Sequence, residues 1–235
     1  MIFGHDYYHG TLRRYVIMFG NLFNELQVHR YNSAGQKVQT IAVPIAYGPK
    51  QKFVERQLSD PTGFKSVQES LPRLAFTMDS LMYAGQRKLN STLKFKNVLN
   101  TNTKTATSVY SPVPYDMTFT LSLLTKNAED GTQIVEQIVP FFTPDFTVTM
   151  KVLPEMNVVL DVPIELTNVT SDDSYEGDFD TSRILSWDLT FTVKGYLFGP
   201  IQGNDKFIFD EEKVKVNVFN GFDATIPEFT IQAES

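Results

Sequence analysis

The chain has 235 residues, of which 42% are hydrophobic and 20% charged, and its formal net charge is −6. This apolar fraction is sufficient for a folded core in one large domain or two small ones. The acidic balance and the absence of a basic cluster argue against free nucleic acid as a ligand, because phosphates are bound by concentrated Lys and Arg. The absence of cysteine excludes disulfides, thiolate nucleophiles and cysteine-ligated zinc.

Targeting and membrane segments are not expected. The opening stretch MIFGHDYYHG has no basic region followed by an apolar run, so it does not resemble a signal peptide. No apolar run approaches the roughly 20 residues that a helix needs to cross a bilayer. We therefore expect a soluble product made in the cytoplasm, with no membrane partner.

The N-terminal part predicts a helix followed by a hairpin. Thr11 to Asn24 is predicted to be helical, with Thr11 as the N-cap and Gly20 permitting close packing. Its apolar residues at helical spacing form the predicted buried stripe, which consists of Leu12, Tyr15, Val16, Phe19, Leu22 and Phe23. From Leu26 the period changes to two, NSAGQ is typical of a turn, and Val38 to Ile45 is the predicted returning strand. Pro44 cannot donate to a ladder, which places this strand at a sheet edge.

The middle of the chain predicts one short helix and three strands. GPKQKFVERQLS is typical of a short helix with Phe53 facing inward, and strands are predicted at Leu74–Met78 and Thr92–Val98. Residues 100–114 are rich in Thr, Asn and Ser and are expected to form an exposed loop. Tyr115 to Leu123 is the clearest strand, because its apolar residues alternate strictly with Asp, Thr and Ser.

The stretch QIVEQIVPFFTPDF predicts a short helix that ends in an aromatic turn. Asp130 followed by Gln133 resembles a capping box, and Pro140 should end the helix near Val139. Only about two and a half turns remain, too few for a helix to persist alone, so it must lie on a sheet. Of Phe141 and Phe142, one should pack inward and the other become a contact; the alternative is that both are core residues.

The remaining sequence completes an α+β prediction. Alternating strands are predicted at Phe146–Val152, Val158–Leu166 and Leu185–Val193, with an acidic loop at Ser171–Ser182. Lys213–Phe219 and Phe229–Gln232 have the pattern of short strands. The whole predicts a mostly antiparallel sheet with a few helices packed on one face, in a domain of residues 1–201 with a C-terminal extension of residues 202–235 packed on it.

Candidate catalytic and metal-ligating residues are few. His5 and His9 have the spacing of a zinc-protease helix, but Asp6 stands where that motif has Glu. The acidic loop fails as an EF-hand, because Arg183 falls where a bidentate Glu is required. Asp116 and Asp188 alternate with Thr or Ser, as on a solvated sheet face. We therefore expect no catalytic residue, no metal ligand and no cofactor.

Five strings occur in one order along the chain: LRRYVIMFGNLFNELQVHR, VPIAYGPKQKF, LPRLAFTM, QIVEQIVPFFTPDF and LSWDLTFTVKGYLFGP. Together they resemble the proximal tail sheath stabilisation proteins of T4-like contractile-tailed bacteriophages, also called tail terminator or tail completion proteins. The resemblance runs from about Leu12 to Ile201.

The resemblance implies a structural virion protein with a tail-terminator-like fold and no enzymatic activity. Its members form a hexameric ring at the head-proximal end of the tail, where the ring ends the growth of the tube, stabilises the last sheath ring and contributes to joining the head. The implied partners are further copies of the chain, the tail tube or a tube terminator, the sheath and neck proteins. The alternatives are another neck or baseplate subunit, or a metal-dependent hydrolase using Asp116, Asp188 or a metal on His5 and His9.

Ring contacts usually combine aromatic anchors with arginine at the rim. The candidate interface residues are accordingly Phe141, Phe142, Arg13, Arg14 and Arg73. For any single arginine the alternative is an ordinary solvated surface position. Because sheath subunits of such tails exchange extended arms, the predicted edge strand Val38–Ile45 is a further candidate, which would accept such an arm by strand addition.

Overall fold

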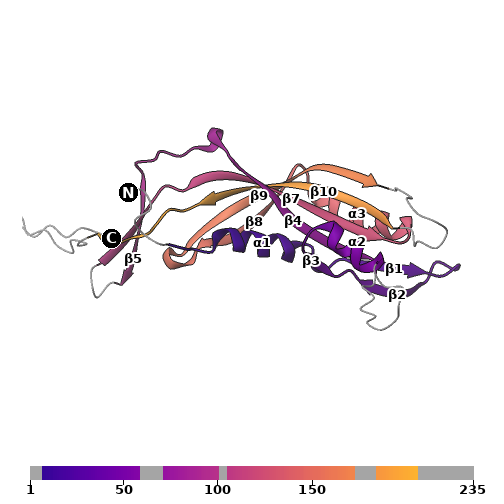
Figure 1. The fold of residues 1–235 in the computed structure, drawn as a ribbon. Coiled ribbons are helices and arrows are strands. Elements are labelled where there is room, and N and C mark those ends of the chain that lie inside the picture. Colours follow the sequence, from indigo (N-terminus) through magenta and orange to yellow (C-terminus); the bar gives the residue numbers. More distant parts are fainter. Residues whose placement is uncertain (1–6, 59–70, 101–104, 173–183, 206–235) are drawn as a thin grey trace, which may run out of the picture. The chain divides into compact units, whose positions relative to one another are not determined.

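The computed structural model describes residues 7–58, 71–100, 105–172 and 184–205 (Figure 1). Contacts divide the chain into two units, residues 1–90 with 112–198 and residues 91–111 with 199–235. Each unit is described by itself. The domain boundary after Ile201 and the packing of the extension stay predictions, and the strands expected at Lys213–Phe219 and Phe229–Gln232 lie outside the described residues.

The larger unit is built on a six-stranded sheet in the order β3-β4-β7-β10-β9-β8. Neighbouring strands are antiparallel except for β3 and β4, which are parallel. The predicted α+β class with a mostly antiparallel sheet is confirmed. The strands are β3 (Ile45–Tyr47), β4 (Arg73–Tyr83), β7 (Val113–Thr125), β8 (Asp145–Leu153), β9 (Val158–Asp172) and β10 (Leu185–Leu197).

The centre of this sheet is formed by β7 and β10, the two strands whose alternation is cleanest in the sequence. Phe119 lies opposite Phe191 and Leu121 opposite Leu189, and all four side chains are buried. The residues that alternate with the apolar ones at positions 116–122 and 186–192 are Thr, Ser or Asp. They point to the opposite face because side chains alternate along a strand. One face of the sheet is therefore apolar and the other polar.

Helix α1 (Thr11–Leu22) covers the apolar face. Phe19 is fully buried, and its ring centroid lies 4.6 Å from that of Phe119, 5.4 Å from Phe191 and 5.5 Å from Phe76. Close packing at Gly20 is confirmed, because a Cβ there would come within 2.9 Å of the Phe76 ring. Two details were wrong: the N-cap is Gly10 rather than Thr11, and Leu12 is exposed rather than part of the buried stripe.

The hydroxyl of Tyr15 ties α1 to β10. It accepts a hydrogen bond from the backbone N–H of Tyr196 at 3.0 Å and donates one to the carbonyl of the same residue at 3.2 Å. Burial raises the pKa of Tyr15 from its ordinary value, so the hydroxyl keeps the proton that it donates.

Helix α3 (Ala128–Ile138) also lies on the apolar face, through Ile134 and Ile138. It stops at the expected place, because Pro140 lies in the following turn η2 (Val139–Phe141). A Cβ at Gly131 would come 2.7 Å from the indole nitrogen of Trp187, so helix and β10 touch closely here. The predicted position of the helix on a sheet is confirmed.

The capping box predicted for α3 was wrong. The N-cap is Asn127, while the side chain of Gln133 accepts a hydrogen bond from the backbone N–H of His29 and donates one to its carbonyl. Asp130 is buried and forms an ion pair with both terminal nitrogens of Arg30, each at 2.7 Å. Both side chains therefore hold the helix against the N-terminal hairpin rather than capping it.

That hairpin forms a separate two-stranded sheet of β1 (Gln27–Tyr31) and β2 (Lys37–Ala42). It projects to the right in Figure 1, with its turn at the tip. The predicted strand Val38–Ile45 is divided: β2 ends at Ala42, and Ile45 begins β3 in the large sheet. The edge position holds, because β2 pairs only with β1 within the described part of the chain.

Helix α2 (Lys50–Leu58) joins β3 to β4 and packs against the polar face at one end. Phe53 contacts Ala75 and Leu124, which alternate with the buried Leu74 and Leu123 of the other face. At the start of the helix, the amine of Lys50 donates to the hydroxyl of Ser186 at 2.8 Å and to the carboxylate of Asp188 at 3.1 Å. The larger unit also contains the short turns η1 (Gly85–Arg87) and η3 (Pro154–Met156).

The smaller unit contains a three-stranded sheet in the order β11-β6-β5. Its strands are β5 (Lys94–Asn100), β6 (Thr105–Tyr110) and β11 (Gln202–Asp205). The exposed loop predicted for residues 100–114 was wrong in its second half, because β6 occupies it and Ser108 and Val109 are buried. Threonine is a strong strand former, so a Thr-rich stretch is compatible with either assignment.

Candidate assembly surface

The aromatic turn after α3 separates its two phenylalanines. Phe142 packs inward, with its ring centroid 5.1 Å from that of Phe191 and 6.0 Å from that of Phe146. Phe141 is 66% exposed. Both rings line a cavity of about 200 Å³ whose wall is otherwise formed by Leu22, Phe23, Leu26, Gln137, Ile138 and Phe146. An exposed aromatic ring beside an apolar hollow is typical of a contact point between proteins.

Phe141→Ser is expected to leave the fold intact and to weaken assembly. Because Phe141 is exposed, the free energy of unfolding should change by no more than about 0.5 kcal/mol. Binding of the chain to contractile tails, the partner that the resemblance implies, should fall at least about tenfold, as for an interface anchor. Urea unfolding and sedimentation with isolated tails measure the two quantities.

Phe142→Ala is the matched control, and it should lower the free energy of unfolding by about 2 kcal/mol because the ring is half-buried in the core. Unchanged tail binding by the Phe141→Ser variant would remove Phe141 from the interface.

The two arginines of α1 have different surroundings. Arg13 is exposed. Arg14 is half-buried, and its guanidinium donates to the carbonyl of Val152 in β8 at 3.0 Å. Arg14 therefore has a structural contact in addition to any role at an interface.

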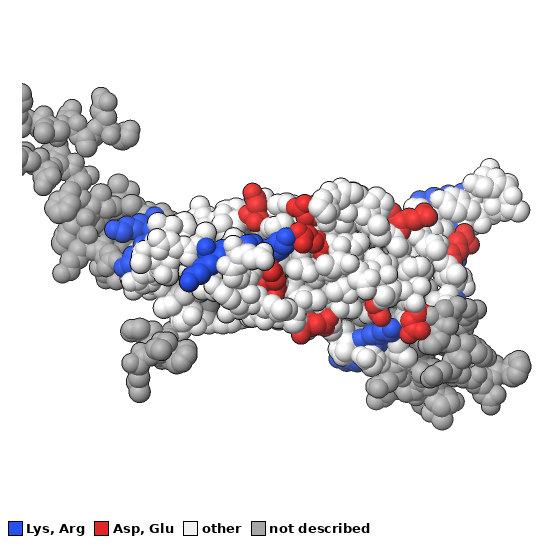
Figure 2. Space-filling view, turned by 90° about the horizontal axis from the view of Figure 1, so that it is seen from above, with Lys and Arg blue, Asp and Glu red and all other residues white. Residues whose placement is uncertain are grey.

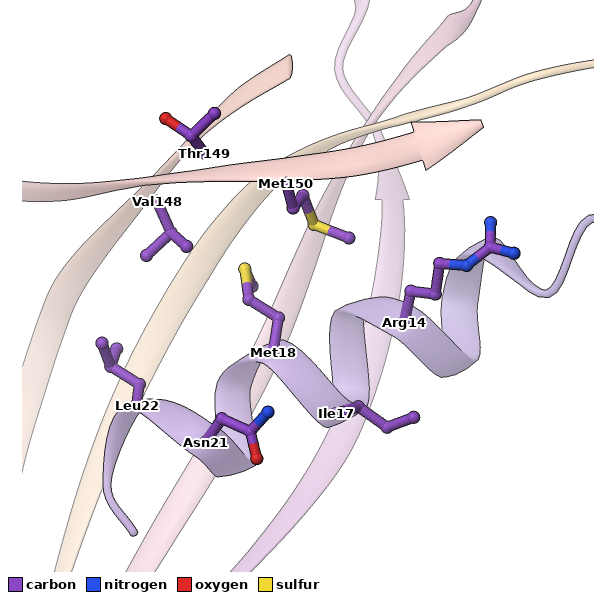
Figure 3. Close-up of a pocket in the computed structure, with 8 residues that line it drawn as sticks. All are labelled: Arg14, Ile17, Met18, Asn21, Leu22, Val148, Thr149 and Met150. Atoms are coloured by element: carbon purple, nitrogen blue, oxygen red, sulfur yellow. The ribbon is translucent and has the colours of Figure 1, made fainter. Parts of the chain in front are cut away.

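A groove runs between α1 and β8 (Figure 3). Its volume is about 460 Å³, and its lining is mostly apolar. Figure 3 shows Val148 and Met150 of β8 pointing toward Met18 and Leu22 of α1, while Thr149 points away. Arg14 lies at one end of this α1–β8 groove, and the cavity beside Phe141 shares Leu22 with the other end.

Arg73 lies apart from the other four predicted interface residues. It alternates with Leu74 in β4 and so faces the side of the sheet opposite α1. Its guanidinium carbon is 4.6 Å from the centroid of the Phe53 ring in α2, a cation–π distance. The structure therefore brings Phe141, Phe142, Arg13 and Arg14 to one side of the sheet, and their interface role stays a prediction.

The polar face contains the carboxylates considered for catalysis, and each has a partner. Asp116 pairs with Arg87, while Asp188 accepts hydrogen bonds from Lys50 and from the hydroxyl of Ser122. Glu165 pairs with Lys194 on the same face. The described surface in Figure 2 shows acidic and basic side chains in small groups among uncharged ones. Asp116 and Asp188 are thus held in ion pairs and hydrogen bonds of the sheet surface.

The possible metal site at the N-terminus is only partly described. His5 lies outside the described residues, and the ring of His9 lies 3.7 Å from the carboxylate of Glu155. Within the described ranges, no group of three or more His, Asp or Glu side chains is arranged to hold a metal ion. None of the helices that the structure describes is long and apolar enough to span a bilayer.

Comparison with known proteins defines the class as a structural component of contractile phage tails. Residues 6–232 match the family described as the T4-like virus Myoviridae tail sheath stabiliser. The tail completion protein gp15 of Enterobacteria phage T4 is 30% identical over 214 residues, which cover 88% of this chain and 77% of that protein. The chain belongs to the T4-like tail sheath stabiliser family, and it is a structural protein of the virion tail.

Sequence reasoning missed the α1–β8 groove and the contacts that hold the hairpin. Ile17 and Met18 lie on the side of α1 that borders β8, outside the stripe used to predict the core. The signal available in the sequence for this groove was a second apolar strip on α1, beside the predicted buried stripe. The pairing of Arg30 with Asp130 had no signal, because the two residues are 100 positions apart.

Proposed function

We propose that the protein forms a closed ring of copies, six in number, at the head-proximal end of the tail. The ring ends the growth of the tail tube, holds the last ring of sheath subunits and presents a surface to the neck. Its activity is mechanical, so no covalent chemistry is assigned to it. Membership of the tail sheath stabiliser family supports binding to sheath and tube.

The observation that carries this proposal is that strands β2 and β8 of the larger unit each have an open edge. In the described structure, β8 pairs only with β9, and β2 pairs only with β1. A subunit with two different open edges suits head-to-tail contacts, which close into a ring when the rotation between copies is right. The exposed Phe141 and the α1–β8 groove add apolar area on the β8 side.

Imaging tails with and without the protein tests the proposal. Tails assembled without it should carry sheath that frays at the head-proximal end, and adding the purified chain should restore an ordered end bearing one ring. Averaging end-on views should give six-fold symmetry. Density along the sheath or at the baseplate would instead favour another structural subunit, and a different symmetry would overturn the number of copies.

A further inference from the structure

The open edges of β2 and β8 differ in what surrounds them. A row of unpaired backbone groups at a sheet edge is a template for pairing with another strand. The edge of β8 is bounded at one end, because the register with β9 is irregular between Lys151 and Leu153 and Arg14 occupies the carbonyl of Val152. The regular part that remains open is Asp145–Lys151.

An incoming strand at this edge would meet two different surfaces. On the α1 side, Phe146, Val148 and Met150 are half-buried, and the latter two border the α1–β8 groove. On the other side, the carboxylates of Asp145 and Asp161 accept hydrogen bonds from Thr147 and Thr149, at 3.4 and 2.5 Å. Neither carboxylate has a cationic partner within the described residues. A strand that fits the edge of β8 therefore has apolar or small side chains on the face toward α1. It has no acidic side chain on the face toward Asp145 and Asp161.

Strand β2 of the same chain has this pattern. Its sequence KVQTIA places Val38, Thr40 and Ala42 on one face and Lys37, Gln39 and Ile41 on the other. Val38 is 68% exposed, an apolar side chain without cover in the single chain. The hairpin Gln27–Ala42 contains no Asp or Glu, so Lys37 could approach Asp145 and Asp161 without repulsion. Its length of six residues fits within the open part of β8.

We infer that β2 of one copy adds to the open edge of β8 in the next copy, with Val38 in the α1–β8 groove. This inference rests on the proposed ring and specifies how its copies join. The contact is heterologous, because each copy uses β2 toward one neighbour and β8 toward the other, so it propagates around a ring. Backbone hydrogen bonds supply the pairing, and alternate side chains supply its specificity.

Cross-linking tests this contact directly, because the chain contains no cysteine. Gln39 and Thr149 are both exposed and would lie on the same outer face of the joined sheet. Full-length chains with Gln39→Cys and Thr149→Cys together, or Gln39→Cys and Thr147→Cys to allow for register, are bound to tails lacking the protein. They are then treated with a short reagent that joins two thiols. A ladder of linked copies up to the full ring is expected from at least one pair.

Controls separate this contact from others. Each single cysteine variant should give no ladder of linked copies. Gln39→Cys combined with Gln86→Cys should give none either, because Gln86 lies in η1 and not on β8. Lys37→Glu should lower ring occupancy on tails about tenfold through repulsion by Asp145 and Asp161, whereas Lys88→Glu should not. Urea unfolding of all variants should match the parent, because these side chains are exposed.

The outcomes distinguish the inference from the proposed function. If a ring forms on tails but no ladder of cross-linked copies appears, the copies join through other surfaces. That result would overturn the inference without contradicting the proposed ring. Thiol links from β2 or β8 to sheath subunits would assign these edges to the sheath and overturn it equally. If no ring forms on tails, both the proposed function and the inferred contact are wrong.

Discussion

Replacing Phe19 with alanine is expected to lower the free energy of unfolding by about 4 kcal/mol. The ring is fully buried and lies within 5.5 Å, between centroids, of the rings of Phe23, Phe76, Phe119 and Phe191. Its removal costs the transfer free energy of the ring and leaves a cavity that stiff aromatic neighbours cannot fill. The free energy of unfolding of a whole domain is about 5–15 kcal/mol, so the Phe19 substitution is expected to remove a large part of it. Urea unfolding followed by circular dichroism measures it.

Ile17→Ala on the same helix is the control for the Phe19 substitution. Ile17 is 51% exposed, so its loss should cost less than about 1 kcal/mol. Alanine is also the better helix former, which offsets part of that loss. If both variants lost the same stability, α1 would be held by something other than its buried aromatic face.

Asp130→Ala is expected to lower the free energy of unfolding by about 3 kcal/mol. The carboxylate of Asp130 is buried, and both terminal nitrogens of Arg30 contact it at 2.7 Å. Removing it leaves the Arg30 guanidinium unpaired and takes a negative charge from the first turn of α3, where the helix dipole favours one. We place the loss at the low end of the range for buried pairs, because the Arg30 side chain is 35% exposed.

A double-mutant cycle isolates the pair from the rest of the site. Asp130→Ala, Arg30→Ala and the double variant should give a coupling free energy of about 2 kcal/mol, while Glu136→Ala on the exposed side of α3 should change little. Hydrogen exchange in β1 and β2 should accelerate in all three cycle variants, because the ion pair holds the hairpin against α3. A coupling near zero would mean that the hairpin is held by Gln133 and apolar packing alone.

The parts of the fold that the sequence predicted well depend on local patterns. Strands β7 and β10 alternate strictly, since one face meets the core and the other faces away, and their register pairs apolar with apolar residues. The end of α3 was placed correctly because the effect of Pro140 on its own backbone does not depend on the rest of the fold. The opposite orientations of Phe141 and Phe142 follow from the same short turn.

The errors arose where distant contacts override local signals. Gln133 has the spacing of a capping residue, but its amide binds the backbone of His29, 104 positions away. Residues 105–110 have loop-like composition, yet they pair with β5 on one side and β11 on the other. The contact of Arg14 with Val152 spans 138 positions, so its role at the end of β8 could not be derived from sequence spacing.

The close approach of Gly131 to Trp187 has a spectroscopic consequence. Trp187 is the only tryptophan of the chain, so all indole fluorescence arises where α3 meets β10. Emission from this single fluorophore reports whether the helix remains seated on the strand, and quenching by a solute would measure how far water reaches that junction. The chain thus carries an intrinsic optical probe of the junction between α3 and β10, which needs no label.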